Sequence, residues 1–227
     1  MIAIIDYGMG NIHSVNKALQ LFGARTVVTN KPGDIRASKK VVLPGVGAFE
    51  DAMLELKKQG LISALTEQIR NKKPFLGICL GMQLLFQESE EAKRVRGLGV
   101  LRGRVKRFEN KRGFKIPHMG WNQLKTVSRL ASYPVNQLEN KNRQTGKQAN
   151  RQTKKCPLLK DIPDNSYVYF CHSYYPDPCN PDHIASTTEY SIEFASIIWQ
   201  DNVYGVQFHP EKSQAVGLKI LENFVNL

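Results

Sequence analysis

Short apolar runs rich in β-branched residues recur along the first half of the chain. They occur at residues 2–5, 27–28, 41–43 and 75–78. Runs of this kind predict strands that are buried on both faces. Because both faces of such a strand must be covered, the runs favour a sheet that packs between helices.

Between these runs, the apolar residues follow helical spacing. Val15, Leu19 and Phe22 form one apolar stripe, and Asn11 stands before it at the position expected of an N-cap. Two further helices are expected, at residues 48–59 and 61–69. Repeated strand–helix units of this length predict a parallel sheet covered on both faces.

The second half of the chain has a different pattern. Residues 98–108 are typical of a hairpin, and a last amphipathic helix is expected at 214–225. Short strands are expected at residues 167–171, 184–188, 195–199 and 203–208. The two halves together predict one α/β domain over residues 1–227, with a doubly wound, mostly parallel central sheet and an antiparallel extension.

Composition indicates a globular protein without a membrane segment. Of the 227 residues, 41% are hydrophobic and 23% are charged, which is enough apolar material for a packed core. No apolar run is long enough to span a bilayer, and residues 1–6 have strand character rather than the basic start of an export signal. We therefore expect a cytoplasmic protein whose four cysteines stay reduced.

A formal net charge of +12 raises the question of a nucleic acid or a membrane surface as partner. Half of the excess lies in residues 138–160, where seven lysines or arginines face one acidic residue, Glu139. This stretch is rich in Asn, Gln and Thr and lacks the aromatic residues that stack on bases. We predict a solvated insertion in a surface loop and no nucleic-acid or membrane partner, with a basic binding arm as the alternative.

A candidate nucleophile lies in the sequence Gly77-Ile-Cys-Leu-Gly81. This Gly-x-nucleophile-x-Gly pattern follows a predicted strand and precedes a segment expected to be helical, as in a nucleophile elbow. The sharp turn demands glycines, exposes the thiol at the carboxyl edge of the sheet and aims the next backbone N–H at a developing oxyanion. The alternative is that Cys79 is a buried apolar cysteine.

A candidate base follows the predicted strand at 203–208. His209 precedes Pro210, which favours an extended backbone, and in extended chain Glu211 points the same way as His209. A cysteine nucleophile needs this pair, because the imidazole takes the thiol proton and the carboxylate orients the imidazole. A surface histidine beside a capping glutamate is the alternative.

Further motifs complete a resemblance to a known family. They are Ile5-Asp-Tyr-Gly-Met-Gly-Asn11, Leu43-Pro-Gly-Val-Gly-Ala-Phe49, Pro117-His-Met-Gly-Trp-Asn122 and His172-Ser-Tyr-Tyr175. With the cysteine and histidine motifs, they make the chain similar to the class I (triad) glutamine amidotransferases. More narrowly, it resembles the family of glutaminase subunits of imidazole glycerol phosphate synthase. The resemblance covers nearly the whole chain and implies that family's flavodoxin-like fold.

The resemblance implies the following catalytic roles. Cys79 attacks the side-chain amide carbon of glutamine, His209 passes the proton to the leaving ammonia, and Glu211 orients His209. The backbone N–H groups of Leu80 and Val46 form the oxyanion hole.

The resemblance also implies a substrate site and a partner. Glutamine is expected to contact Gly45, Gln83, Ser173 and Tyr174. The expected partner is a (β/α)₈ cyclase subunit, which uses the ammonia to make imidazole glycerol phosphate and aminoimidazole carboxamide ribotide in histidine biosynthesis. Trp121 and Lys212 are expected at the interface, and neither a metal nor an organic cofactor is expected.

Other interpretations remain open. Gly8-Met-Gly10 resembles half of a dinucleotide fingerprint, although His13 stands where the third glycine belongs. Four residues could be taken for zinc ligands, although they include no Cys-x-x-Cys pair: Cys171, His172, Cys179 and His183. The triad residues also fit a stand-alone cysteine hydrolase, and the basic stretch fits a non-catalytic binding module.

Overall fold

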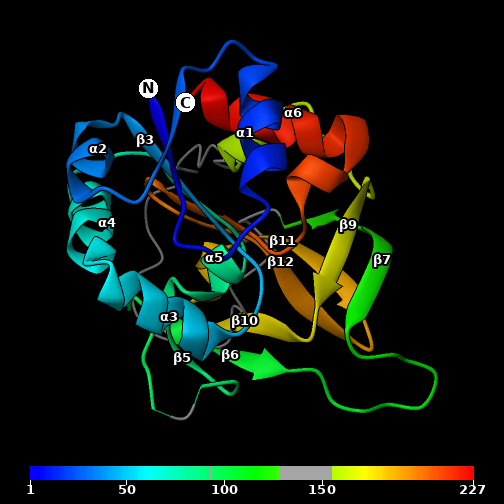
Figure 1. The fold of residues 1–227 in the computed structure, drawn as a ribbon. Coiled ribbons are helices and arrows are strands. Elements are labelled where there is room, and N and C mark those ends of the chain that lie inside the picture. The colour runs from blue at the N-terminus through cyan, green and yellow to red at the C-terminus, as the bar shows by residue number, and fades with distance from the viewer. Residues whose placement is uncertain (93, 128–154) are drawn as a thin grey trace, which may run out of the picture.

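An eight-stranded sheet runs through the described part of this computed structural model, which comprises residues 1–92, 94–127 and 155–227 (Figure 1). Its strands stand in the order β2 (Thr26–Thr29), β1 (Ile2–Ile5), β3 (Lys40–Gly45), β4 (Phe75–Cys79), β13 (Val203–Val206), β12 (Ile192–Gln200), β11 (Ile184–Tyr190) and β8 (Lys125–Thr126). The first five are parallel, and the last three extend the sheet antiparallel. The predicted mostly parallel sheet with an antiparallel extension is therefore confirmed.

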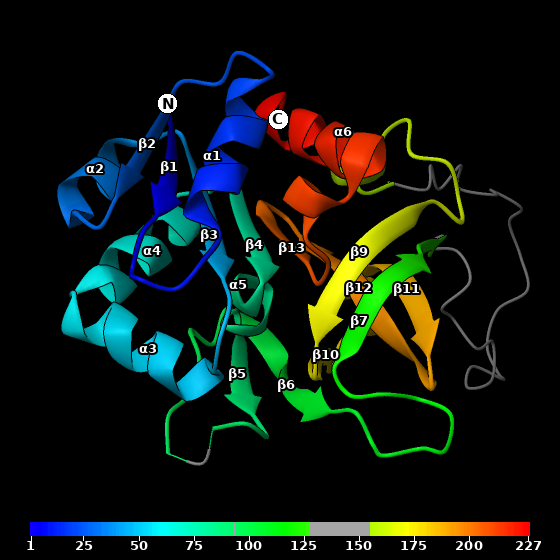
Figure 2. The same ribbon diagram turned by 45° about the vertical axis from the view of Figure 1, so that its right-hand side comes forward.

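Helices cover both faces of the sheet (Figure 2). The three helices on one face are α2 (Pro32–Ala37), α3 (Phe49–Lys58) and α4 (Leu61–Arg70), and the two on the other are α1 (Ile12–Gln20) and α6 (Gln214–Val225). In β1, Ala3 and Ile5 belong to the first of these cores, whereas Ile2 and Ile4 belong to the second. Because every residue of the strand is buried, its sequence is an unbroken apolar run.

Two smaller sheets lie beside the central sheet (Figure 2). One contains β5 (Phe86–Ser89), β6 (Leu101–Arg107) and β10 (Tyr174–Pro178). The other is a ribbon of β7 (His118–Gln123) and β9 (Tyr167–His172). Three short 3₁₀ helices complete the described elements: η1 (Pro157–Leu159), η2 (Pro181–His183) and η3 (Pro210–Lys212).

The predicted hairpin at 98–108 is wrong. Residues 101–107 form the single strand β6, which pairs antiparallel with β10 and parallel with β5. Its alternation of buried and exposed residues is that of one half-buried strand. The pattern therefore identified a strand, but the partners of that strand lie elsewhere in the chain.

The helix expected after the nucleophile is only one turn long. α5 spans Leu80–Gln83, and the chain enters β5 at Phe86. The helices expected at 48–59, 61–69 and 214–225 correspond to α3, α4 and α6. Their long amphipathic stripes make such elements the easiest to locate from sequence.

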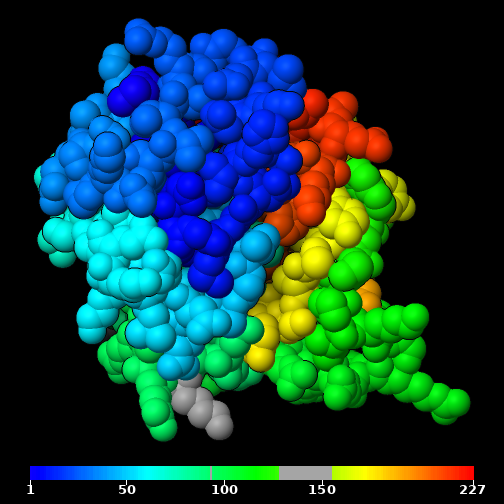
Figure 3. Space-filling model, in the orientation of Figure 1, coloured from blue at the N-terminus to red at the C-terminus, as the bar shows by residue number. Residues whose placement is uncertain are grey.

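Segments far apart in the sequence lie side by side in the fold. α1 packs against α6, and on the face shown in Figure 3 the blue N-terminal residues border the yellow and red C-terminal ones. No helix of the described residues is long and apolar enough to cross a membrane. That the chain is one domain stays a prediction, and most of the predicted insertion at 138–160 lies outside the described residues.

Candidate active site

The turn between β4 and α5 holds Cys79 in an unusual backbone conformation. Its φ is 53° and its ψ is −110°, a region that residues with side chains rarely adopt. A Cβ at Gly77 would come within 2.6 Å of the Gly81 carbonyl oxygen, and a Cβ at Gly81 would overlap the Leu43 carbonyl oxygen in β3. The glycines on either side of the cysteine are thus needed for the turn to pack between β3 and β4.

His209 and Glu211 lie beside this turn because β13 is the parallel neighbour of β4. The chain continues from β13 to His209, whose N–H donates to the Tyr169 carbonyl oxygen at 2.9 Å and whose own carbonyl oxygen accepts from Ser213 Oγ at 2.6 Å. His209 Nδ1 lies 3.0 Å from Glu211 Oε1. Cys79 lies close enough to the imidazole to influence its pKa, and both side chains line one cavity, so the structure brings the three predicted triad residues together.

The surroundings of His209 favour its protonated form. Burial by itself would lower the pKa of His209, but hydrogen bonds and charge interactions with Cys79 and Glu211 outweigh burial and raise it to about 10. Both side chains of the histidine–glutamate pair are shielded from water, at 5% and 1% exposure. The site is therefore arranged to hold an imidazolium between a sulfur and a carboxylate.

Asn11 has a different role from the one expected. It occupies the position before α1, but its side chain makes no capping hydrogen bond. Instead its Nδ2 donates to Glu211 Oε1 at 3.4 Å, across 200 positions of sequence. Local pattern gave no signal for this contact, because the carboxylate comes from the other end of the chain.

A cavity of about 320 Å³ opens above the Cys79 sulfur. The expected site residues on its wall are Cys79, His209, Val46, Leu80, Gln83, Ser173, Tyr174 and Lys212. Residues on its wall that were not expected are Gly47, Glu91, Pro117, Cys171 and His172. Gly45 is absent from this wall; it pairs with Cys79 in the sheet, and a Cβ there would meet the Tyr7 hydroxyl.

Two polar side chains on the wall, Gln83 and Glu91, each keep an oxygen that can still accept a hydrogen bond. Gln83 Nε2 donates to the Tyr174 carbonyl oxygen at 2.9 Å and to Gln207 Oε1 at 3.1 Å, so both of its hydrogens are used. Glu91 Oε2 accepts from the Phe49 N–H at 2.8 Å. The free Gln83 oxygen and the second Glu91 oxygen can each accept a hydrogen bond from a bound ammonium group.

Trp121 and Lys212 both lie near the ring of Tyr169. In the β7–β9 ribbon Trp121 is opposite Tyr169, with ring centroids 6.1 Å apart, and Lys212 Nζ lies 6.0 Å from the same tyrosine ring. Trp121 is 46% exposed and Lys212 is exposed as well. Lys212 lines the cavity and Trp121 does not, so Tyr169 connects an exposed aromatic residue with the cavity wall.

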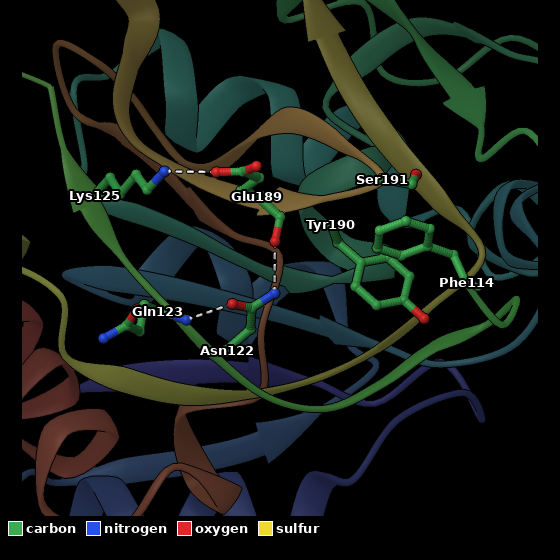
Figure 4. A pocket seen from close by; sticks show the side chains of 7 residues that line it. All are labelled: Phe114, Asn122, Gln123, Lys125, Glu189, Tyr190 and Ser191. Atoms are coloured by element: carbon green, nitrogen blue, oxygen red, sulfur yellow. Dashed lines mark hydrogen bonds and ion pairs between the residues drawn. The ribbon is translucent and has the colours of Figure 1, made fainter. Parts of the chain in front are cut away.

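A second hollow of about 380 Å³ lies where the ends of β7, β8 and β11 meet (Figure 4). It is lined by Phe114, Asn122, Gln123, Lys125, Glu189, Tyr190 and Ser191. Its one charged pair, Lys125 with Glu189 at 2.8 Å, is neutralised internally, and its wall has no cysteine or histidine. Among the described residues, no three His, Cys, Asp or Glu side chains cluster so as to hold a metal ion.

Known proteins resemble this chain along its whole length. Residues 3–227 match the family "Glutamine amidotransferase class-I". The imidazole glycerol phosphate synthase subunit HisH of Desulfitobacterium hafniense is 46% identical, covering 99% of this chain and 93% of that protein. The same-named subunit of Methanocaldococcus jannaschii is 44% identical over 100% of both chains.

A solved structure supports the same fold. The crystal structure of a glutamine amidotransferase superposes with a TM-score of 0.69 over 100% of both chains, at 13% identity. This similarity concerns the arrangement of elements, and the family assignment rests on the sequence matches. The chain belongs to the class I glutamine amidotransferases and, within them, to the HisH family of imidazole glycerol phosphate synthase subunits.

Proposed function

We propose that this chain is the glutaminase subunit of an imidazole glycerol phosphate synthase, in which it hydrolyses glutamine and passes the ammonia to a cyclase. The observation that supports this most directly is the buried His209–Glu211 pair, 3.0 Å apart, whose histidine shares the wall of one cavity with Cys79. Relatives of 44–46% identity that carry the HisH name support the choice of synthase.

The proposed reaction proceeds through a covalent intermediate. The Cys79 thiolate attacks the side-chain amide carbon of glutamine, and the carbonyl π electrons move to the oxygen. When the C–N bond breaks, His209 gives its proton to the leaving nitrogen, and ammonia departs. Water then adds to the γ-glutamyl thioester, with His209 taking its proton, and glutamate leaves while the thiolate reforms. Glu211 holds the imidazole in the required orientation throughout.

The oxyanion is assigned to two backbone N–H groups. Leu80 follows the nucleophile at the start of α5, and Val46 belongs to the loop after β3; both line the cavity. Such donors stabilise the charge that develops on the carbonyl oxygen. The Gly47 φ of 101° shows that this loop uses a conformation that favours glycine.

The ends of the glutamine molecule are assigned by charge. The α-ammonium group fits the free oxygens of Gln83 and Glu91, because both accept hydrogen bonds and one is a carboxylate. Ser173 and Tyr174, on the wall of the same cavity, supply donors for the α-carboxylate. Glu91 extends the set of residues expected from the sequence.

The partner in this proposal is a (β/α)₈ cyclase subunit. It would receive the ammonia and convert a phosphoribosyl substrate to imidazole glycerol phosphate and aminoimidazole carboxamide ribotide. We assign its docking face to the surface with Trp121 and Lys212, since an exposed aromatic residue and a cation next to the cavity suit an interface. A cytoplasmic location stays a prediction from the sequence.

The test separates the two half-reactions. Cys79→Ala should abolish synthesis from glutamine and leave synthesis from added ammonium salt unchanged, because the cyclase uses ammonia directly. Product formation by the reconstituted complex is the measurement. Cys179→Ala, at an exposed cysteine outside the cavity, is the matched control and should keep both activities. Glutamine-dependent synthesis by the folded Cys79→Ala complex would refute the proposal.

A further inference from the structure

The side chain of Gln207, directly after β13, points at the nucleophile. Its Nε2 lies 3.7 Å from Cys79 Sγ, and the residue is fully buried. We propose that Gln207 is a further catalytic residue that donates an N–H to the Cys79 sulfur, and that a chain of hydrogen bonds from β7 through His118 and His172 fixes its amide. An amide N–H directed at the sulfur stabilises the thiolate relative to the thiol.

The direction of the Gln207 amide follows from its neighbours. The Tyr174 carbonyl oxygen can only accept a hydrogen bond, so the Gln83 atom 2.9 Å away must be its nitrogen. The second hydrogen of that nitrogen then points at Gln207 Oε1, 3.1 Å away. Gln207 therefore presents its NH₂ group to Cys79. The reversed amide would place an oxygen against the thiolate and would lose the bond to Gln83.

The same Tyr174 carbonyl oxygen is held from a second side by a histidine pair. His172 Nδ1 lies 2.8 Å from that oxygen and must be the protonated ring nitrogen. His172 Nε2 is consequently an acceptor, and His118 Nδ1, 3.3 Å away, donates to it. His118 Nε2 is then also an acceptor, and it faces Asn122 Nδ2 at 3.3 Å.

The Asn122 end of this series of hydrogen bonds independently gives the same assignment of the histidine ring protons. Asn122 Nδ2 donates to the Glu189 carbonyl oxygen at 2.9 Å, and Asn122 Oδ1 accepts from the Gln123 N–H at 2.8 Å (Figure 4). The amide of Asn122 is thereby fixed with its nitrogen toward His118. Both ends thus require Nδ1–H tautomers of the two histidines.

The histidine pair is kept in this uncharged state by its surroundings. Burial lowers the pKa of His118 to about 4. Burial is the larger cause and the neighbouring His118 the next, and together they lower the pKa of His172 to about 3. A protonated His118 would direct an N–H at the NH₂ group of Asn122, so the chain of hydrogen bonds requires the neutral rings. Because both residues are at most 5% exposed, water does not compete for these bonds.

The series of hydrogen bonds begins on β7, a strand that also has an exposed face. On β7, His118 and Asn122 point inward, whereas Met119 and Trp121 point outward with 62% and 46% exposure. A partner that presses on the outer face would move the strand that sets the first of these bonds. This coupling rests on the proposed function, in which the cyclase docks there, and it gives that partner a physical route to the nucleophile.

The rate of Cys79 alkylation by iodoacetamide as a function of pH tests the role of Gln207. The full-length chain is used, and peptide mass spectrometry separates Cys79 from the exposed Cys179, which serves as an internal reference. Gln207→Leu should raise the pH midpoint of Cys79 alkylation by about one unit, as expected for losing one hydrogen bond to a charged group. Gln207→Glu, which keeps the size of the side chain, should raise it further. An unchanged midpoint in either folded variant would overturn the catalytic role.

Variants of the histidine pair test the chain of hydrogen bonds. His172→Phe keeps a ring but removes the donor to Tyr174, so it should raise the Cys79 midpoint in the same direction. His172→Asn places an amide N–H near the former Nδ1 and should restore part of the shift. Phe170→Leu is the packing control, because Phe170 stacks on His118 and supplies no side-chain bond to the chain. Equal shifts in Phe170→Leu and His172→Phe would overturn the proposal that hydrogen bonds through the histidine pair fix the Gln207 amide. If His172→Phe fails to fold, His118→Phe repeats the test.

The alkylation readout does not depend on the proposed function. It needs neither glutamine nor a cyclase, so the midpoints report only on the environment of the sulfur. Shifted midpoints in a protein that fails to hydrolyse glutamine would refute the glutaminase and leave the role of Gln207 in place. Unshifted midpoints in an active glutaminase would refute the role of Gln207 and leave the proposed glutaminase function in place.

Discussion

His209 owes its elevated pKa to two neighbours. Burial alone would lower it, but Cys79 and Glu211 together raise it to about 10. The unfolded imidazole titrates at about pH 6.5. Protonated His209 therefore stabilises the fold fully below about pH 6.5, and this contribution is lost as the pH rises through about 10.

Replacing Glu211 tests this arrangement at a single residue. Glu211→Gln removes a negative charge from His209, so its pKa should fall and the basic limb of the pH–rate profile of glutamine hydrolysis should move to lower pH. The rate should drop about a hundredfold or more, the range expected when a general acid–base group is impaired. Asn11→Ala, which removes only the 3.4 Å bond to the same carboxylate, is the control with a smaller effect. A basic limb that stays in place would contradict the role of Glu211.

Sequence motifs identified the residues that lie in a recognisable short segment. They missed the residues whose own segment has no such pattern. Cys79 stands out by its flanking glycines, and Glu211 by its spacing from His209. Glu91 and Gln207 have no comparable local signal. Gln207 follows β13, the neighbour of β4 in the central sheet, and Glu91 follows β5 in a separate sheet, and no periodicity of a single chain encodes such distances.

Among the elements, the turn at Cys79 has the least tolerance for added atoms. Gly81→Ala would put a methyl group onto the Leu43 carbonyl oxygen, and the backbone of β3 or α5 would have to move. We expect a loss of about 2–3 kcal/mol in the free energy of unfolding, hence a Tm lower by about 4–12 °C. Glutamine hydrolysis should fall as the sulfur is displaced.

The matched control for this substitution is Gly33→Ala. Gly33 lies in α2 and has no positive φ, and a methyl group added there would meet no other atom within 4 Å. Alanine there should leave Tm unchanged or raise it slightly, because alanine favours the helix by about 0.5–1 kcal/mol. Thermal unfolding of both variants measures the difference. Similar Tm values would show that the turn is less tightly packed than the structure has it.

Elements with long periodic patterns could be predicted, whereas short ones and their pairings could not. α6 was expected at the residues that it occupies, because its apolar stripe extends over three turns. β6 was mistaken for a hairpin because alternation shows which face of a strand is buried and not which strand lies beside it. β7 was not expected as a strand, since Met119 and Trp121 are exposed and give its sequence no clear apolar face.

For the whole molecule, the fold class followed from the succession of strand and helix patterns, but the order of strands did not. β4 and β13 are neighbours although 123 residues separate their last and first residues, and this pairing brings Cys79 and His209 to one edge of the sheet. The antiparallel strands β12, β11 and β8 complete the sheet on the side that bears β7 and β9. Fold and family are thus confirmed, while the docking of a partner remains a proposal.

The docking face can be located by comparing two exposed apolar residues on different elements, one in β7 and one at the end of α1. Trp121, 46% exposed, lies beside the active-site cavity. Leu21, 70% exposed, follows the end of α1, which returns from the active-site edge of the sheet because it joins the parallel strands β1 and β2. The two side chains therefore report on different faces.

Trp121→Ala should weaken binding of the cyclase subunit about thirtyfold or more, since a buried interface tryptophan often contributes 2 kcal/mol or more. If the docked partner acts on Cys79 through β7 as proposed, glutamine hydrolysis at a fixed cyclase concentration should fall with binding, and excess cyclase should restore it. Leu21→Ala should leave both the Kd and the activation unchanged. Isothermal titration with the cyclase gives the Kd, and glutamate release with and without cyclase gives the activation. If Leu21→Ala weakens binding as much as Trp121→Ala does, the partner docks elsewhere. It would then not contact β7, and the proposed coupling from β7 to Cys79 would be refuted.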